Sequence, residues 1–268
     1  MVIGNKKFEE NRTYIMGILN VTPDSFSDGG KFNNIDAALK HTEQMIKDGA
    51  DIIDVGGESA RPNYTKISDE EEIGRVTPVI EAIKKNFDIP VSIDTYKSAV
   101  GEAAIKSGAD LMNDIWGFKY DEKMAEITAK YNKTCCLMHN RKEAVYNNFI
   151  EDVLADLKES VDIALKAGVK KENIMLDPGV GFAKSYEQNL EITNKLEMLN
   201  TLGYPVLLGT SRKSMIGLTL DLPADKRVEG TLATTVLAVI KNAMFVRVHD
   251  VLENKRIIKM TERILGKA

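Results

Sequence analysis

The chain has 268 residues, of which 43% are hydrophobic and 28% charged, and it carries a formal net charge of −4. These values are ordinary for a globular protein, and a small negative charge excludes the extended basic surface of a nucleic-acid-binding protein. No stretch approaches the roughly 18 consecutive apolar residues of a membrane span, and residues 1–12 do not resemble a signal peptide. We therefore expect a cytoplasmic protein that binds neither nucleic acid nor a membrane.

Short runs rich in Val, Ile and Leu recur along the whole chain. Most show little alternation of apolar and polar residues, which is typical of parallel strands that are covered on both faces. The runs are YIMGILNVT (14–22), DIIDVG (51–56), PVSIDT (90–95), LMNDIWG (111–117), KTCCLMH (133–139), NIMLDPG (173–179), PVLLGTS (205–211) and FVRVHD (245–250).

Amphipathic patterns lie between these runs and predict helices. The clearest one ends at Gly168, a predicted C-terminal cap. Its apolar residues are Ile150, Val153, Leu154, Leu157, Val161 and Ala164. Ser68 and Glu71 have the spacing of a capping box and predict the start of another helix, which we expect Pro78 to kink or divide.

The last two helices are predicted over 225–242 and 251–265, which completes about eight strand–helix units. Eight such units close a (β/α)₈ TIM barrel, here a single α/β domain over residues 1–268. An open doubly wound sheet also alternates strands and helices, but eight units that end in a helix favour closure. Cys135 and Cys136 are neighbours on a predicted strand, so they should point to opposite faces as buried, reduced thiols.

Polar residues gather where the predicted strands end, which is the face of such a barrel that carries active sites. A single buried polar side chain can be part of a structural network, but repetition at the same end of successive strands indicates a site. The residues are Asn20, Asp54, Glu58, Asp94, Asn113, Asp114, His139, Asp177, Ser211, Arg212, Lys213, Arg247 and His249.

One group within this set combines carboxylate, amide and ammonium: Asp94, Asn113, Asp177 and Lys213. Together they offer hydrogen-bond donors and acceptors that suit a flat, nitrogen-rich heterocycle. Apolar walls for such a ring are expected from Ile115, Met138 and Phe182. The alternative is that the aspartates form a buried ion pair with Lys213 or with an arginine.

A second group is suited to an anion: Asn20, Arg61, Arg247 and His249. Arginine binds phosphate through two parallel hydrogen bonds, and the spacing of Arg247 and His249 places them on the same side of a strand. A structural role for His249 is the alternative. A hard cation such as Mg²⁺ could be held by Asn20 together with substrate oxygens. No P-loop, nucleophile elbow or zinc motif is present.

These residues lie in motifs that resemble the dihydropteroate synthase family of folate biosynthesis. The resemblance covers nearly the whole chain. Its motifs are GILNVTPDSFSDGG, DIIDVGGESARP, SIDTYKSAVGEAAI, MNDIWG, DPGVGFAKSYEQNL, GTSRKSMIG and RVHDV. The resemblance implies the condensation of 6-hydroxymethyl-7,8-dihydropterin diphosphate with p-aminobenzoate, which yields 7,8-dihydropteroate and pyrophosphate.

The resemblance also implies roles for individual residues. The pterin would contact Asp94, Asn113, Ile115, Met138, Asp177, Phe182 and Lys213. The diphosphate would contact Asn20, Arg61, Arg247 and His249, with Mg²⁺ near Asn20. The p-aminobenzoate would contact Phe26, Pro62, Lys213 and Ser214, a site that sulfonamides target. Asp94, Lys213, Arg247 and His249 would be catalytic.

Two loops are implied to move over this site, residues 22–30 and the segment that carries Arg61 and Pro62, with Phe26 capping the p-aminobenzoate ring. The chain departs from the family at Ala60, where a threonine is usual, so we expect weaker anion binding or a compensating water, without loss of activity. The resemblance further implies a homodimer through the later helices, such as 225–242.

The charges predict a dissociative, SN1-like substitution that needs no strong general base. Two other functions compete with this interpretation. A methyltetrahydrofolate:corrinoid methyltransferase domain would share the aspartates and the asparagine, but it has no use for the anion group or for NVTPDSFSDGG. A non-catalytic pterin-binding protein is the second, and a pyrophosphate-release assay distinguishes all three.

Overall fold

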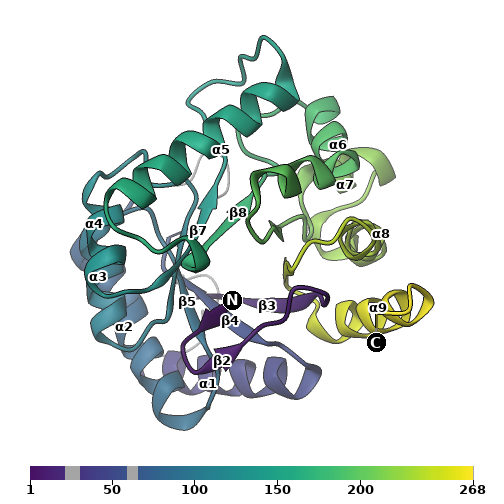
Figure 1. The fold of residues 1–268 in the computed structure, drawn as a ribbon. Helices are drawn as coiled ribbons and strands as arrows, with labels where there is room; N and C mark the ends of the chain where they lie inside the picture. The colour runs from purple at the N-terminus through teal and green to yellow at the C-terminus, as the bar shows by residue number, and fades with distance from the viewer. Residues whose placement is uncertain (22–30, 59–65, 268) are drawn as a thin grey trace.

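The computed structural model describes residues 1–21, 31–58 and 66–267. Eight parallel strands form a sheet in the order β8-β7-β6-β5-β4-β3-β10-β9. A parallel bridge between Leu176 and Val206 joins the two outer strands, so the sheet is a nearly closed barrel surrounded by helices (Figure 1). The (β/α)₈ prediction is therefore confirmed. No helix within the described ranges is both long and apolar enough to cross a membrane.

The strands match the predicted runs but are shorter than them. They are β3 (Tyr14–Asn20), β4 (Ile52–Gly56), β5 (Val91–Asp94), β6 (Leu111–Asp114), β7 (Thr134–Met138), β8 (Ile174–Asp177), β9 (Leu207–Leu208) and β10 (Phe245–Val248). Most of the polar residues at the C-terminal ends of the predicted runs thus fall on the last two strand positions or in the loops that follow, whereas Asp54 lies in the middle of β4.

The helices follow the strands in the expected alternation. They are α1 (Lys31–Asp48), α2 (Asp69–Asn86), α3 (Ser98–Lys106), α4 (Lys123–Lys130), α5 (Phe149–Lys166), α6 (Tyr186–Asn194), α7 (Ser214–Leu220), α8 (Val228–Ile240) and α9 (Val251–Ile264). Short 3₁₀ segments occur at η2 (Lys171–Asn173), η3 (Leu196–Leu202) and η4 (Ala224–Lys226). The predictions for 225–242 and 251–265 correspond to α8 and α9.

Helix α2 confirms one prediction and contradicts part of another. Its N-cap is Ser68, whose hydroxyl accepts a hydrogen bond from the backbone N–H of Glu71 at 3.2 Å. Pro78 does not divide the helix, which runs unbroken from Asp69 to Asn86. Proline removes a single backbone donor, and the buried apolar face of α2, which includes Val79 and Ile83, stabilises the helix on both sides of it.

Two apolar layers hold the barrel together. One lies between the strands and the helices and includes Cys135, whereas the other lies inside the barrel and includes Cys136. Both thiols are free and buried, as predicted from their alternation along β7. Burial raises the pKa of each thiol above its usual value.

An N-terminal hairpin, which the sequence did not predict, covers one end of the barrel. It consists of β1 (Val2–Ile3) and β2 (Lys6–Lys7). Ile3 and Phe8 are buried in the inner layer, and the ring of Phe8 lies 5.3 Å from that of Phe245 at the start of β10. Because the hairpin closes the N-terminal end of the strands, a ligand must approach from their C-terminal end.

Candidate active site

The inward-facing strand positions change from apolar to polar near the C-terminal end of the barrel. Ile52, Leu111 and Met175 belong to the inner apolar layer. Because strand side chains alternate between two faces, the residues two positions later also point inward. These are Asp54, Asn113 and Asp177, and Arg247 follows Phe245 on β10 in the same way. The barrel thus carries a layer of charged and amide groups directly above its apolar interior.

Arg247 joins two carboxylates across this layer. Its Nε donates to Asp54 Oδ2 at 2.6 Å, and one terminal nitrogen donates to Asp94 Oδ2 at 2.6 Å. Asn113 Nδ2 lies 3.3 Å from Asp54 Oδ2 and completes the cluster. The alternative of an ion pair with an arginine is therefore realised for Asp94. The predicted ring-binding group and the predicted anion-binding group are therefore in contact, through the ion pair of Asp94 with Arg247.

Burial dominates the proton equilibria of this cluster. It raises the pKa of Asp94 to about 7 against the opposing effect of Arg247. Burial alone would lower the pKa of Arg247, but Asp54 and Asp94 more than offset it and hold that pKa above its usual value. The guanidinium is therefore a permanent cation, whereas Asp94 exchanges its proton near neutral pH.

Asp177 and Lys213 lie beside the same cluster. A Cβ placed on Gly209 would lie 3.5 Å from Asp177 Oδ2, 3.9 Å from Arg247 Cβ and 4.0 Å from Lys213 Nζ, so all three side chains surround bare backbone. Burial raises the pKa of Asp177 and lowers that of Lys213 to about 8, while the opposite charge of each partner counteracts both shifts. Asp177 thus offers a hydrogen-bond acceptor and Lys213 a donor next to the backbone of Gly209, which carries no side chain.

The predicted apolar residues flank these groups. Met138 occupies the last inward position of β7 and is buried. The ammonium of Lys213 lies 4.8 Å from the centroid of the Phe182 ring, and it also donates to the carbonyl of Val180. Ile115 directly follows β6 and is partly exposed. A flat ligand over Gly209 would thus have an aromatic wall on the side of Lys213 and Phe182.

Two of the predicted anion residues, Asn20 and His249, lie at the rim. Asn20 ends β3, and its side-chain oxygen lies 3.6 Å from the position of a Cβ on Gly56, while Asp94 Oδ2 lies 3.8 Å from that position. His249 follows β10, and its Nδ1 lies 2.9 Å from Ser211 Oγ. Ser211 also accepts the backbone N–H of His249 at 3.1 Å. The sequence singled out Ser211 only as a strand-end residue, and here it fixes the orientation of the imidazole.

The remaining predicted site residues have different outcomes. Ser214 is the first residue of α7, next to Lys213, and it is exposed. Phe26, Arg61 and Pro62, together with Ala60, lie outside the described residues, so their predicted roles stay predictions.

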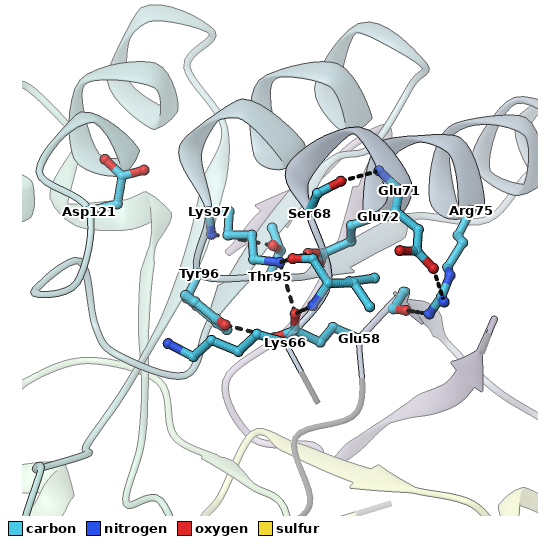
Figure 2. A network of polar contacts seen from close by, with 12 residues as sticks. Glu58, Lys66, Ser68, Glu71, Glu72, Arg75, Thr95, Tyr96, Lys97 and Asp121 are labelled. Carbon is cyan, nitrogen blue, oxygen red and sulfur yellow. Dashed lines mark hydrogen bonds and ion pairs between the residues drawn. The ribbon is translucent and has the colours of Figure 1, made fainter. Parts of the chain in front are cut away.

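A buried ion cluster lies at the C-terminal ends of β4 and β5 (Figure 2). Lys97 Nζ lies 2.8 Å from both Glu58 Oε2 and Glu72 Oε2, and it donates to the carbonyl of Ile67 at 2.9 Å. Tyr96 donates to Glu58 Oε1 at 2.7 Å. Burial would raise the pKa of Glu58, but these hydrogen bonds hold it below its usual value, whereas burial raises the pKa of Glu72. The cluster ties the end of β4 to the segment that precedes α2.

His139, at the end of β7, faces away from the interior of the barrel. Inward positions of β7 are even-numbered, so residue 139 points outward, where its Nε2 lies 3.0 Å from Asp156 Oδ2 on α5. Its side chain is fully buried, and burial lowers its pKa to about 4. Its Nδ1 contacts Lys184, a residue that the sequence analysis did not single out.

Comparison with known proteins shows the family to which the chain belongs. The sequence profile of the family described as "Pterin binding enzyme" matches residues 16–249. The chain is 66% identical over 267 residues to the dihydropteroate synthase of Clostridium beijerinckii, with 99% of each chain covered. It is 55% identical to that of Bacillus subtilis, with 96% of this chain and 90% of the relative covered.

Solved structures give the same result. A dihydropteroate synthase from Clostridium difficile, crystallised in the presence of pteroic acid, superposes with a TM-score of 0.93 at 51% identity over 98% of each chain. The Yersinia pestis enzyme in complex with a sulfonamide drug superposes with a TM-score of 0.92 at 37% identity, over 100% of this chain and 99% of that one.

Proposed function

Because the chain belongs to the pterin binding enzymes and, within them, to the dihydropteroate synthases, we propose that the C-terminal end of its barrel holds the pterin ring and its diphosphate in two adjoining subsites. We name the first of these the pterin slot and define it as Asp94, Asn113, Asp177 and Lys213. The observation that carries the proposal is the convergence of Asp177, Lys213 and Arg247 on the bare backbone of Gly209.

The pterin slot matches the hydrogen-bonding edge of a pterin. Ring N–H groups and the exocyclic amine donate, so they pair with carboxylate oxygens, whereas the ring nitrogen and carbonyl accept from ammonium or amide. Asp177 and Lys213 supply one such pair side by side. Phe182 and Met138 pack on the faces of the ring.

The diphosphate would extend from the slot toward Asn20, Arg61, Arg247 and His249. Arg247 belongs to both subsites, since it contacts Asp94 and points from β10 toward the same end. The described residues contain no group of three His, Cys, Asp or Glu side chains that could hold a metal ion by themselves. A single amide oxygen from Asn20 fits Mg²⁺, because this ion usually keeps several waters and is completed by substrate phosphates. Bound there, Mg²⁺ would neutralise the charge of the leaving pyrophosphate.

The chemistry follows from the distribution of charge. Arg247 and His249 stabilise the negative charge that grows on the departing diphosphate, and Asp94 and Asp177 stabilise the positive charge that grows on the pterin. The C–O bond to the diphosphate breaks first, the neutral aromatic amine of p-aminobenzoate then attacks the cationic methylene through its lone pair, and the resulting ammonium loses one proton to water or to the pyrophosphate. We therefore propose an SN1-like substitution in which Lys213 contacts both the pterin and the incoming p-aminobenzoate.

The p-aminobenzoate subsite would be formed by Lys213 and Ser214 together with Phe26 and Pro62. Lys213 and Ser214 are adjacent at the start of α7, so an ammonium and a hydroxyl from neighbouring positions would attract the carboxylate. Sulfonamides, which carry an aromatic amine and a polar acidic group, are expected to compete for this subsite.

We further propose a homodimer that acts in the cytoplasm. Large apolar side chains are exposed on the last helices, among them Leu218 on α7, Ile240 on α8 and Met260 on α9. Contact between two copies would cover such side chains. The buried free thiols of Cys135 and Cys136 suit a reducing compartment. Sedimentation velocity at micromolar concentration tests the dimer, and a single monomeric species would refute it.

A pyrophosphate-release assay tests the proposed function. The purified chain is given the pterin diphosphate and Mg²⁺, with or without p-aminobenzoate. Release that depends on p-aminobenzoate, falls on chelation of Mg²⁺ and is accompanied by dihydropteroate supports the proposal. Binding of the pterin without release would indicate a non-catalytic protein, and methyl transfer from methyltetrahydrofolate would indicate the corrinoid-dependent alternative.

A further inference from the structure

The turn between β8 and α6, residues 178–184, supplies a wall of the pterin slot in a constrained conformation. Gly179, Gly181 and Ala183 have positive φ angles of 68°, 87° and 44°. A Cβ on Gly179 would lie 1.9 Å from the carbonyl oxygen of His139, so the turn presses against the end of β7. Ala183 in this region of φ is strained, and such strain persists only where surrounding contacts fix the backbone.

Polar side chains from several elements hold the backbone of this turn. Asp177 accepts the N–H of Gly179 at 2.7 Å, and Asn189 of α6 accepts that of Gly181 at 2.6 Å. The hydroxyl of Tyr146 donates to the carbonyl of Ala183 at 2.7 Å. On the side of the slot, Lys213 donates to the carbonyl of Val180.

Lys184 holds the same turn from behind. Its ammonium donates to the carbonyls of Gly179 at 2.9 Å and Phe182 at 3.0 Å, and to His139 Nδ1 at 2.8 Å. These three acceptors match its three N–H groups. Since Nδ1 of His139 accepts, Nε2 carries the proton and donates to Asp156 at 3.0 Å. The chain of contacts thus ends on a carboxylate of α5, a helix outside the barrel.

We propose that Lys184 is a positioning residue for the pterin, which acts by fixing the 178–184 turn so that Phe182 and Lys213 meet the ring in a preset geometry. The inference rests on the proposed pterin slot. Two lysines donate to carbonyls of one turn, and of the two only Lys213 belongs to the proposed pterin slot. Burial lowers the pKa of Lys184 to about 7, which is an energetic cost that a lysine in a surface turn would not carry.

The effect should be selective for one substrate. Loss of Lys184 removes the ammonium donor from two carbonyls, of which that of Gly179 keeps only the N–H of Phe182, and it lets Ala183 relax, which displaces Phe182 and the carbonyl that receives Lys213. Of the p-aminobenzoate subsite, Ser214 lies on α7, outside the contacts of Lys184, and Lys213, which both substrates share, is reached only through the carbonyl of Val180. Positioning therefore predicts a change in KM for the pterin diphosphate, whereas a general loss of folded enzyme would lower kcat and leave both KM values unchanged.

The test compares Lys184→Met with Lys195→Met. Lys195, the C-cap residue of α6, is half-exposed and forms an ion pair with Glu191 on the surface of the same helix, so it is a matched control for the substitution. We expect Lys184→Met to raise KM for the pterin diphosphate about tenfold or more, which is the size of effect that loss of hydrogen bonds from a charged donor produces. The KM for p-aminobenzoate should rise less than about twofold. Unchanged KM values, or equal increases in both, would overturn the proposal.

Two further variants keep the test decisive. Tyr146→Phe removes one hydroxyl from the same turn, so it should raise KM for the pterin diphosphate about two- to fivefold even if Lys184→Met does not fold. No selective change in Tyr146→Phe would then overturn the proposal. Asp177→Asn separates this inference from the slot itself. If Asp177→Asn weakens pterin binding and Lys184→Met does not, the positioning role is wrong; if neither does, the slot is wrong.

Discussion

Replacing Asp177 by asparagine isolates the contribution of one carboxylate to pterin binding. The substitution keeps the shape of the side chain and an oxygen that can still accept the N–H of Gly179, now 2.7 Å from Oδ1. It removes the charge at Oδ2, which lies next to Gly209 and the ammonium of Lys213. The turn should therefore survive, while the acceptor offered to the ring is lost.

The magnitude follows from the environment of the group. A hydrogen bond to a buried charged acceptor contributes about 1.5–3 kcal/mol, which is roughly a 10- to 150-fold change in Kd. Isothermal titration calorimetry with 6-hydroxymethylpterin, which lacks the diphosphate, should show this loss. Pyrophosphate titrated into the same variant should bind with a Kd within about threefold of the wild type, because the anion subsite is formed by other residues.

Asp114→Asn is the matched control for this experiment. Asp114 is also a buried carboxyl at a strand end, but it faces outward and accepts the backbone N–H groups of Trp116 at 2.8 Å and Phe118 at 2.9 Å. Its substitution should lower stability and leave pterin affinity unchanged. If Asp177→Asn binds 6-hydroxymethylpterin as tightly as the wild type, the pterin slot is assigned to the wrong residues.

Two further predictions concern charge. Lys97→Met leaves Glu58 and Glu72 without their shared cation, so it should lower the free energy of unfolding by about 3–5 kcal/mol in urea titrations. Lys106→Met is the exposed control, and an effect of Lys97→Met below about 1 kcal/mol would contradict the stabilising role of the cluster. Because burial raises the pKa of Asp94 to about 7, this carboxyl loses its proton as pH rises from 6 to 8, and kcat should rise over that range as negative charge accumulates beside the pterin. A pH profile of pyrophosphate release that is equally steep in Asp94→Asn would exclude this cause.

The sequence predicts the barrel well because each of its signals is local. Short apolar runs, helical periodicity and the N-cap at Ser68 depend on neighbours along the chain, and the structure retains all three. The hairpin of β1 and β2 was not predicted, because strands of two residues are too short to show a hydrophobic period. Strand β9 is similarly reduced to Leu207–Leu208, between Pro205 and Gly209.

The site was harder to predict because its contacts cross the barrel. Strand β10 pairs with β3 and β9, so nothing in the order of strands brings Arg247 to Asp54 on β4 or Asp94 on β5. The outward direction of His139 could have been found, since it follows from alternation after Met138. Lys184 could not, because a lysine after glycines in a loop has the pattern of a solvated turn.

The charges of the site explain why its acidic residues are suited to a leaving-group reaction. Asp54 and Asp94 are both bound to Arg247, and Asp177 faces Lys213, so three carboxylates oppose two cations when all are ionised. In the proposed site the excess negative charge would lie beside the ring, and the rim residues Asn20 and His249 would lie beside the diphosphate. As the bond to the diphosphate lengthens, positive charge would grow beside the carboxylates and negative charge beside the rim residues and Arg247. The same residues therefore interact more strongly with the separated charges than with the intact substrate, which is the condition for accelerating the chemical step.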